Sequence, residues 1–388
     1  MEREPDQGER TRLAWLGMVL TPGMGAIRTV RAATRLGGAA RMLSASLTEL
    51  EGAGMPAAAA QFCFDGRAVR AADEELRRVE EAGGQIMTLD DTLYPDNLRN
   101  IYDPPPVLWV RGDARLLSRS GIGVVGTRHP SPYGSGMAEV LSRDLAARGL
   151  VIFSGMARGV DTAAHKGALA ACNGRTVAVW GTSIDVIYPK ENKRLAEEIV
   201  GNGGAILSEF PLGTFPAPQN FPIRNRVISG LSVGVLVIEA GEHSGTRVTA
   251  RCAMEQNRDV YAVPGNVTNK NAWGPNTLIK QGAKLTATWE DVWEDLPSQV
   301  RQALEDELGT GDESNRSGVA SLLSSAELPE AERAILEHLR QDESLQLDEL
   351  MERLEGRLES PEIFTALFEL ELAGHVRQMP GKNYLRTM

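Results

Sequence analysis

The chain has 388 residues, of which 42% are hydrophobic and 24% charged, a composition typical of a folded protein with two or three domains. No segment approaches the ~20 apolar residues of a membrane-spanning helix, and the charged, polar start of the chain does not resemble a secretory signal. Three widely spaced cysteines exclude a disulfide framework and a cysteine-based zinc site, so we expect a cytoplasmic protein.

The net charge of -11 is distributed unevenly along the chain. Residues 290–388 hold 23 acidic and 9 basic residues, so this part carries -14 and the preceding part carries +3. The acidity therefore belongs to the C-terminal part. A mildly basic remainder is compatible with a polyanionic partner but does not identify one.

The N-terminal residues 1–84 predict a helical domain, because residues 11–84 are rich in Ala and Leu. The break LTPGMG at 20–25 lies between two stretches with helical periodicity, as in a helix-hairpin-helix, where backbone N–H groups can bind a phosphate. The same glycines would also turn the chain in a plain helical bundle. The small number of basic neighbours, Arg28 and Arg31, slightly favours the bundle.

Short apolar runs then alternate with helix-length segments as far as residue 285. The runs lie at residues 107–110, 122–125, 151–153, 177–180, 205–207, 235–238 and 260–263. Buried strands that alternate with helices predict an α/β fold with a parallel, doubly wound, Rossmann-like sheet, and we assign residues 85–295 to this domain. Ligands of such sheets bind at the carboxyl ends of the strands.

The C-terminal part divides into a linker and a small domain. Residues 296–328 contain few large apolar side chains and predict a flexible linker. Residues 329–388 show three helical patterns followed by two short strands, which is the plan of a winged helix. The third helical pattern, 361–373, has three acidic residues and no basic one, so we expect it to contact a protein or regulate rather than read DNA.

The segment GIGVVG at 121–126 matches the dinucleotide-binding pattern GxGxxG. Its context argues against that function, because the first two glycines lie within the predicted strand and only Gly126 falls at the turn. No acidic residue ends the next strand either. We therefore expect no cofactor, and the sequence shows no metal-ligand cluster.

Several loops that follow strands carry anion-binding groups. Gly126 lets a phosphate approach the backbone, Thr127 offers a hydroxyl and Arg128 a bidentate charge, although a tight turn with an exposed arginine explains the same residues equally well. Glycines such as Gly155 after the next strand allow a similar approach. In a later loop, Ser244 and Gly245 can wrap an anion at the start of a helix. Glycine-rich loops also occur simply to let helices approach a sheet.

The segment NFPIRNR at 220–226 combines an aromatic ring with two guanidinium groups at the start of a predicted helix. The face of Phe221 can stack on any nucleobase, and the forks of Arg224 and Arg226 can hold backbone phosphates. With the loop SEFPLG at 208–213, five such loops should meet along one rim of the sheet. Their convergence predicts a ligand that bears phosphates.

Two carboxylates in these loops allow an enzymatic alternative. Asp161 and His165 stand one helical turn apart, which suggests acid–base chemistry, but no nucleophile is adjacent and we expect Asp161 to cap its helix and pair with His165. In a nucleotide-processing hydrolase, the catalytic carboxylate would be Glu239 or Asp161. Release of free base from nucleoside monophosphates would favour this alternative.

Ordered sequence blocks resemble a known family over roughly half of the chain. They include GVVGTRHPSPYG at 123–134, FSGMARGVDTAAHKGAL at 153–169, NFPIRNRVISGLS at 220–232 and IEAGEHSGTRVTA at 238–250. These blocks resemble the DNA-processing protein A (DprA/Smf) family. The resemblance implies a cytoplasmic protein that binds and protects single-stranded DNA during natural transformation and helps to load the RecA recombinase.

The same resemblance implies an extended Rossmann core that forms a homodimer, with no known enzymatic activity, flanked by a helical SAM-like or helix-hairpin-helix-like domain and a winged helix. It also implies that a DNA-binding pocket is formed by Gly126, Thr127, Arg128, Phe221, Arg224, Asn225 and Arg226. The resemblance implies less directly that the dimer interface includes Asn276, Leu278 and Ile279. Our hypothesis is one cationic, aromatic-lined pocket for single-stranded DNA. A third interpretation makes the RecA-binding surface the whole function.

Overall fold

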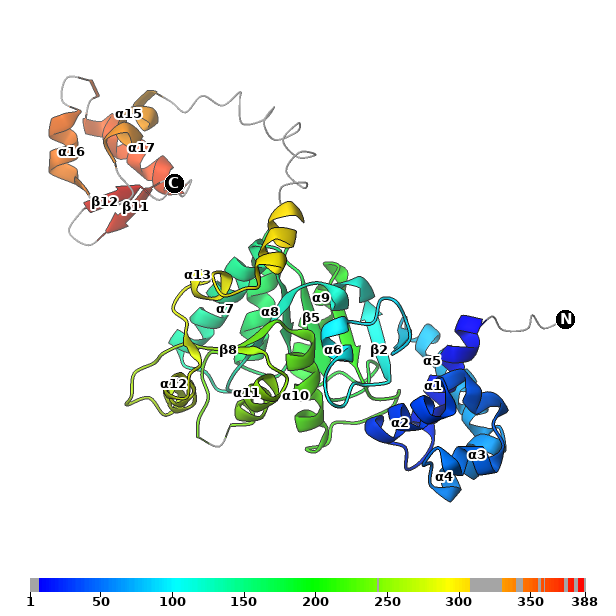
Figure 1. Cartoon of the computed structure of the whole chain (residues 1–388). Helices are drawn as coiled ribbons and strands as arrows, with labels where there is room; N and C mark the ends of the chain where they lie inside the picture. The colour runs from blue at the N-terminus through cyan, green and yellow to red at the C-terminus, as the bar shows by residue number, and fades with distance from the viewer. Residues whose placement is uncertain are drawn as a thin grey trace. The chain divides into compact units, whose positions relative to one another are not determined.

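The computed structural model of the chain forms two compact units, Met1–Leu308 and Gly309–Met388, and each is described by itself (Figure 1). The structure describes residues 7–242, 244–307, 330–339, 345–354, 357–358, 360–372, 376–379 and 383–386. Among the helices of these residues, none is both long and apolar enough to cross a membrane.

A nine-stranded sheet forms the centre of the first unit. Its order is β1-β2-β6-β5-β4-β3-β7-β8-β9; the pairs β1–β2 and β2–β6 are antiparallel, and the other pairs are parallel. This arrangement confirms the predicted α/β class with a mostly parallel sheet. The strands are β1 Gln85–Thr88, β2 Val107–Gly112, β3 Gly121–Val125, β4 Val151–Ser154, β5 Thr176–Trp180, β6 Ala205–Ser208, β7 Gly234–Val237, β8 Asp259–Ala262 and β9 Lys284–Leu285.

Helices cover both faces of this sheet because its central strands are apolar on both faces. In β3, Ile122 and Val124 share a core with Leu141 of α7, whereas Val125 packs with Val227 of α10 on the opposite face. Every residue of β3 is buried. The helices that follow β1 are α6 Asp96–Arg99, α7 Pro132–Ala147, α8 Val160–Ala170, α9 Lys193–Gly201, α10 Asn220–Leu231, α11 Thr246–Glu255, α12 Trp273–Lys280 and α13 Glu290–Trp293.

The glycines of the GxGxxG match serve packing within the sheet. A Cβ on Gly121 would lie 2.3 Å from the carbonyl oxygen of Val151 on β4, and one on Gly123 would lie 3.0 Å from Ser232 Oγ. At the strand end, a Cβ on Gly126 would lie 2.5 Å from the side chain of Val160, at the start of α8. These glycines therefore let neighbouring elements approach β3, as the strand context of the motif predicts.

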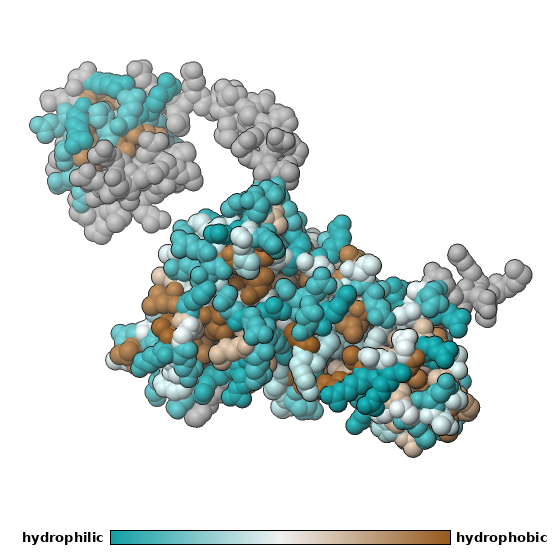
Figure 2. Space-filling model, viewed as in Figure 1, coloured by the Kyte–Doolittle hydropathy of each residue, from teal (hydrophilic) through white to brown (hydrophobic). Residues whose placement is uncertain are grey.

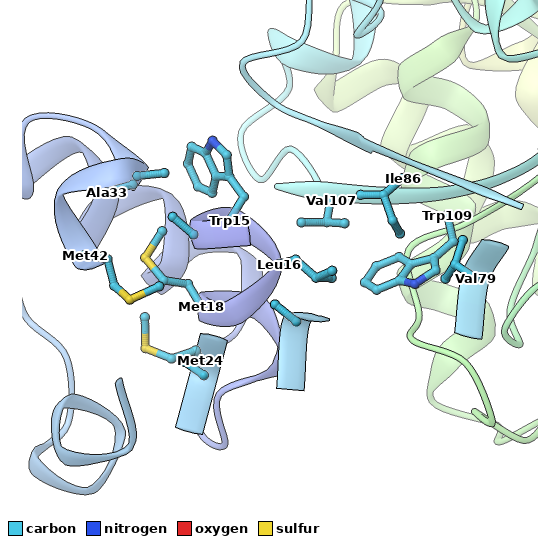
Figure 3. Packing of buried hydrophobic residues seen from close by; sticks show 14 of the residues in the cluster. Trp15, Leu16, Met18, Met24, Ala33, Met42, Val79, Ile86, Val107 and Trp109 are labelled. Carbon is cyan, nitrogen blue, oxygen red and sulfur yellow. The ribbon is translucent and has the colours of Figure 1, made fainter. Parts of the chain in front are cut away.

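The N-terminal helices share a hydrophobic core with the edge of the sheet. Leu16 of α1 and Val79 of α5 belong to the same buried cluster as Val107 and Trp109 of β2, and Figure 3 shows the Trp109 ring beside Leu16 and Val79. Trp109 Nε1 also donates a 2.9 Å hydrogen bond to Oε1 of Glu75. The region comprises α1 Gln7–Leu20, α2 Ala26–Leu36, a 3₁₀ turn at Ala39–Ser44, α3 Leu47–Gly52, α4 Ala57–Phe64 and α5 Arg67–Glu81.

A further helix, residues 298–307, closes the first unit. The segment predicted as a linker, 296–328, overlaps it, because Leu304 is buried against the core on the α7 and α8 face of the sheet and Val300 packs beside it. Arg119 forms an ion pair with Glu307 in the last turn. Residues 308–328 of the predicted linker lie outside the described residues.

The second unit confirms the predicted winged helix. Its described helices pack around buried leucines, and a small sheet has the order β10-β12-β11. The third helix carries no lysine or arginine. The elements are α15 Glu330–His338, β10 Leu345–Gln346, α16 Leu347–Arg353, α17 Ser360–Leu372, β11 Val376–Met379 and β12 Asn383–Arg386.

Candidate nucleic-acid interface

A cavity of about 840 Å³ lies at the carboxyl ends of β3 and β7. The strand order reverses at this point, because β4 lies on one side of β3 and β7 on the other, and doubly wound sheets bind ligands at such positions. We call this cavity the Phe221 pocket. Eight of the sequence-predicted site residues line it, namely Gly126, Thr127, Arg128, Phe221, Arg224, Asn225, Ser244 and Gly245.

The turn after β3 is held in place by backbone hydrogen bonds to two neighbouring elements. Thr127 N donates to the carbonyl oxygen of Glu239 at 2.7 Å, and the Thr127 carbonyl accepts from Val160 N at 3.2 Å. The Thr127 hydroxyl accepts from His129 N at 3.2 Å. The position of Arg128 is therefore set by a turn that is fixed between the end of β7 and the start of α8.

The buried carboxylate of Glu239 organises the loop that leads from this turn into α7. One oxygen accepts from Ser131 N at 2.8 Å and the other from the Ser131 hydroxyl at 2.6 Å. The amides of Asn269 and Asn271 donate to the same two oxygens at 3.2 and 3.4 Å. All four donors come from the protein itself, so this carboxylate acts as a positioning group for the loop of Arg128.

An aromatic platform with a guanidinium above it forms one wall of the pocket. Arg128 Cζ lies 5.6 Å from the centroid of the Phe221 ring, and the Tyr188 ring lies 5.6 Å from the same centroid at 38°. A Cβ on Gly181 would lie 2.9 Å from the Phe221 ring, so this glycine gives the ring room to lie against the backbone after β5. The structure thus brings an aromatic face and a guanidinium charge together, the two groups that the sequence hypothesis requires.

Arg224 forms the buried base of the pocket. Its Nη1 donates to the carbonyl oxygen of Val179 at 2.6 Å, and a Cβ on Gly155 would lie only 1.8 Å from Nη1. Burial lowers the pKa of Arg224 to about 10, although the negative charge of Asp161 opposes this shift. The guanidinium therefore remains charged at neutral pH. Gly155 lines a small adjoining cavity that Arg128, Phe221 and Arg224 also line.

Asp161 neither caps its helix nor pairs with His165, so both parts of this expectation from the sequence are wrong. Asp161 Oδ2 instead accepts from the backbone N–H groups of Gly155 and Ala157 at 3.1 and 3.3 Å. Burial raises the pKa of Asp161 to about 6, although Arg224 opposes the shift. His165 Nδ1 lies 2.7 Å from the Thr176 hydroxyl, and burial lowers its pKa to about 3, so the ring is neutral.

Arg226 lies outside the Phe221 pocket, contrary to the sequence prediction. Residues two apart on a helix point to different faces, so Arg226 is directed away from Arg224. Its Nη2 lies 2.5 Å from Glu209 Oε2 and its Nε lies 3.0 Å from Asp103 Oδ2. The side chain is therefore part of a largely buried ion-pair cluster. Burial in this cluster raises the pKa of Glu209 to about 7, against the attraction of Arg226.

The remaining wall combines α10 with the start of α11. Asn225 Nδ2 donates to the carbonyl oxygen of Gly245 at 3.5 Å. The Ser244 hydroxyl donates to Thr246 Oγ1 at 2.9 Å and accepts from Thr246 N at 3.2 Å. His243 lies outside the described residues. This wall contributes amide and hydroxyl groups to the lining of the pocket.

Comparison with known proteins identifies the family. Residues 85–297 match the model of DNA recombination-mediator protein A, and residues 320–382 match that of the DprA winged helix domain. The chain belongs to the DNA recombination-mediator protein A (DprA/Smf) family. This membership confirms the resemblance seen in the sequence blocks.

Individual relatives of this DprA/Smf chain align over most of their length. It is 39% identical over 317 residues to Protein Smf of Escherichia coli (strain K12), covering 81% of this chain and 80% of that protein. It is 42% identical over 231 residues to DNA processing protein DprA of Bacillus subtilis (strain 168), covering 59% of this chain and 77% of that protein. The X-ray structure of DprA from Streptococcus pneumoniae superposes with a TM-score of 0.66 at 32% identity, covering 76% of this chain and 99% of that one.

The positions carried over for a dimer contact lie in α12 of this DprA/Smf chain. Asn276 exchanges two hydrogen bonds with the backbone of Gly265, at 2.9 Å and 3.2 Å, and so holds the loop after β8. Leu278 is buried in the core of its own chain, and Ile279 packs against that core. The part of the dimer expectation that rests on these side chains stays a prediction.

Sequence reasoning missed the role of two residues at the pocket. Tyr188 is not among the site residues predicted from the sequence, although its position after the strand at 177–180 places it on the same rim as the other loops. Glu239 was weighed as a catalyst, whereas it acts on the loop of Arg128. A further signal for Tyr188 was its aromatic character, since aromatic rings beside basic residues are typical of single-strand binding.

Proposed function

We propose that the Phe221 pocket binds single-stranded DNA with little sequence preference. The observation that carries this proposal is the guanidinium of Arg128, 5.6 Å above a ring of Phe221 that also lies beside Tyr188. Every base has a face that can stack on such a ring, while the backbone phosphate is neutralised by the arginines, and neither contact reads a base edge.

The same pocket supports a role in recombination without catalysis. Protection of bound strands and delivery to the RecA recombinase fit a member of a recombination-mediator family. A cytoplasmic location is part of this proposal. A homodimer would present two pockets to one strand, and the second contact would gain from the effective concentration that the first creates. We assign positioning roles to the two carboxylates of the enzymatic alternative, since Glu239 holds Ser131 in the loop of Arg128 and Asp161 accepts from the backbone of Gly155.

Titration of a fluorescent oligothymidine against the full chain tests the DNA-binding proposal. Phe221→Ala should weaken binding roughly 5- to 150-fold, because loss of base–aromatic stacking costs about 1–3 kcal/mol per base. Arg128→Ala should weaken binding and flatten the salt dependence by about 0.7 logarithmic units, the value for one phosphate on a single strand. Phe64→Ala is a matched control, since Phe64 is an exposed ring on α4 that does not line the pocket.

Two results would count against this function. If Phe221→Ala and Arg128→Ala both bind the oligothymidine like the Phe64→Ala control, the pocket is not the DNA site. If the unaltered chain binds none of the oligothymidine, DNA binding itself is refuted, and a role confined to RecA contact would remain. Competition with unlabelled duplex then measures the preference for single strands.

A further inference from the structure

A second cavity, of about 770 Å³, lies between α2 and the first turn of α10. We call it the α2 groove. Pro222 lines both this groove and the Phe221 pocket, so the two cavities flank the same turn of α10. Figure 2 shows hydrophilic surface where the N-terminal helical region meets the body that holds the sheet.

Three arginines line the α2 groove from one face of a helix. Arg28, Arg31 and Arg35 follow the spacing i, i+3, i+7, which places them in a single row about 10 Å long. All three are exposed, and within the part of the chain that the structure describes none forms an ion pair with a carboxylate. By contrast, Arg77 and Arg78 of α5 pair with glutamates of their own helix.

Two of these guanidiniums are anchored by backbone carbonyls. Arg28 Nη1 donates to the carbonyl oxygen of Gly23, and Arg35 Nη1 donates to that of Ala53 at 3.4 Å. Each bond uses one of the five N–H donors of a guanidinium. A Cβ on Gly54, whose φ is +93°, would lie 2.7 Å from Arg35 Nη1, so the glycine leaves room for this side chain. Arg28 and Arg35 are thus oriented before any ligand arrives.

The opposite wall of the α2 groove does not neutralise the positive charge of the three arginines. Pro222 and Ile223 of α10 contribute apolar surface, and Ile223 is 41% exposed. Asp103 is the one carboxylate among the described lining residues, and its Oδ2 lies 3.0 Å from Arg226 Nε, which also lines the groove. The α2 groove therefore has an excess of positive charge over an apolar edge, and this combination suits a polyanion with apolar side groups.

We propose that the α2 groove holds the phosphates of the single strand that continues from the Phe221 pocket around the first turn of α10. This inference rests on the proposed function, because it gives the strand a direction away from Phe221. The shared Pro222 places the two cavities on either side of one helical turn, and the row of arginines is long enough to meet more than one successive phosphate. The N-terminal helical region is then part of the DNA-binding surface.

The test compares strands of different length on the full chain. The triple variant Arg28→Ala/Arg31→Ala/Arg35→Ala should bind the shortest oligothymidine held by the unaltered chain with unchanged affinity. For long oligothymidine its affinity should fall roughly tenfold or more, and the slope of log affinity against log salt should flatten by about 2, as expected for three phosphate contacts on a single strand.

A matched control removes the same charge from another surface of the helical region. Arg67, Arg70 and Arg77 of α5 are exposed and do not line the α2 groove. Replacing these three with Ala should leave both short- and long-strand affinities within about twofold, because distant surface charges are screened by salt. If the groove triple variant folds poorly, Arg31→Glu provides the second test, since this exposed side chain can be changed without disturbing the core.

Each outcome supports or overturns the inference. Equal long-strand binding by the groove variant and the control variant overturns it while leaving the Phe221 pocket intact. An equal loss of affinity for short and long strands also overturns it, since the arginines would then attract DNA through long-range electrostatics without contacting its phosphates. If the unaltered chain binds no oligothymidine of any length, the proposed function fails and this inference fails with it. Length-dependent loss in the groove variant alone supports it.

Discussion

At the scale of single residues, the pocket depends on glycines that make room for larger groups. Gly155 allows the guanidinium of Arg224 to lie against the backbone, since a Cβ would stand 1.8 Å from Nη1. Gly181 does the same for the Phe221 ring, at 2.9 Å. The sequence showed glycines in these loops. In the structure, their missing Cβ atoms leave space for side chains of α10 at the ends of the strands.

Gly155→Ala should therefore displace Arg224 and weaken oligothymidine binding, while the free energy of unfolding falls by about 1–3 kcal/mol from overpacking. Gly136→Ala in α7 is the matched control, because no atom lies within 4 Å of a Cβ there and alanine favours a helix by about 0.5–1 kcal/mol. Urea unfolding and oligothymidine titration measure both effects. Unchanged binding by Gly155→Ala would show that Arg224 need not lie where it does.

His165 predicts a specific loss of stability in acid. Burial lowers its pKa from 6.5 to about 3, so below pH 6.5 the unfolded chain binds a proton that the folded chain does not. Stability must then fall as the pH falls, by about 1.4 kcal/mol per pH unit and hence about 2 kcal/mol between pH 6.5 and 5. The buried Asp161 acts in the opposite direction, since its raised pKa lowers stability as the pH rises from 3.8 towards 6.

The variant His165→Gln isolates this effect, because it lacks the titrating ring and retains Asp161. Urea unfolding at pH 7 and pH 5 should show a smaller loss of stability for the variant than for the unaltered chain, by about 2 kcal/mol. Tryptophan fluorescence reports on the first unit alone, since all six tryptophans lie within residues 15–293. Identical losses in both proteins would contradict a neutral His165 in the folded state.

At the scale of elements, the loop between β3 and α7 is shaped by contacts that no local sequence pattern contains. Glu239 follows β7, more than 100 residues from Ser131, yet it accepts two hydrogen bonds from that residue. The apolar runs predicted strands β2–β8 correctly, because strands buried on both faces of a sheet are largely apolar. Strands β1 and β9 escaped prediction since they lie at the sheet edges and contain few apolar residues, with the sequences QIMT and KL.

Glu239→Gln tests whether this element positions the site. If charge alone mattered, removal of a carboxylate beside the pocket would strengthen binding of a polyanion. Because Glu239 instead holds the loop of Arg128, we expect oligothymidine affinity to fall severalfold. Glu242→Gln is the matched control, since it removes the same charge from the same strand end and its side chain is exposed, so binding should be unchanged or slightly tighter. Tighter binding by Glu239→Gln would refute the positioning role.

Also at the scale of elements, the helical period explains why the prediction from the segment NFPIRNR was right for Phe221 and Arg224 and wrong for Arg226. The sequence correctly placed Phe221 and Arg224 beside the turn of Arg128. It treated Arg226 as equivalent to Arg224, although two residues on a helix separate side chains onto different faces. The acidic partners that hold Arg226, Glu209 and Asp103, are distant in sequence and therefore could not be read from the motif.

At the scale of the whole molecule, the sequence separated a helical domain, 1–84, from the sheet domain, whereas the first unit spans both. Composition marks where helices give way to strands, but it does not show which apolar faces meet. Leu16 and Trp109 are both fully buried in one cluster, and Glu75 of α5 accepts the hydrogen bond of the Trp109 indole. Helical region and sheet should therefore unfold together.

Leu16→Ala measures this coupling. A buried leucine replaced by alanine costs about 2–5 kcal/mol, and because the cavity would open beside Val107 and Trp109, the whole first unit should lose that stability in one transition. Far-ultraviolet circular dichroism and tryptophan fluorescence should shift to the same lower urea midpoint. Ile335→Ala, a buried residue of the second unit, should leave the fluorescence transition unchanged. Two separate transitions in Leu16→Ala would instead mean that the helical region unfolds independently, and the α2 groove would then join two elements that can part.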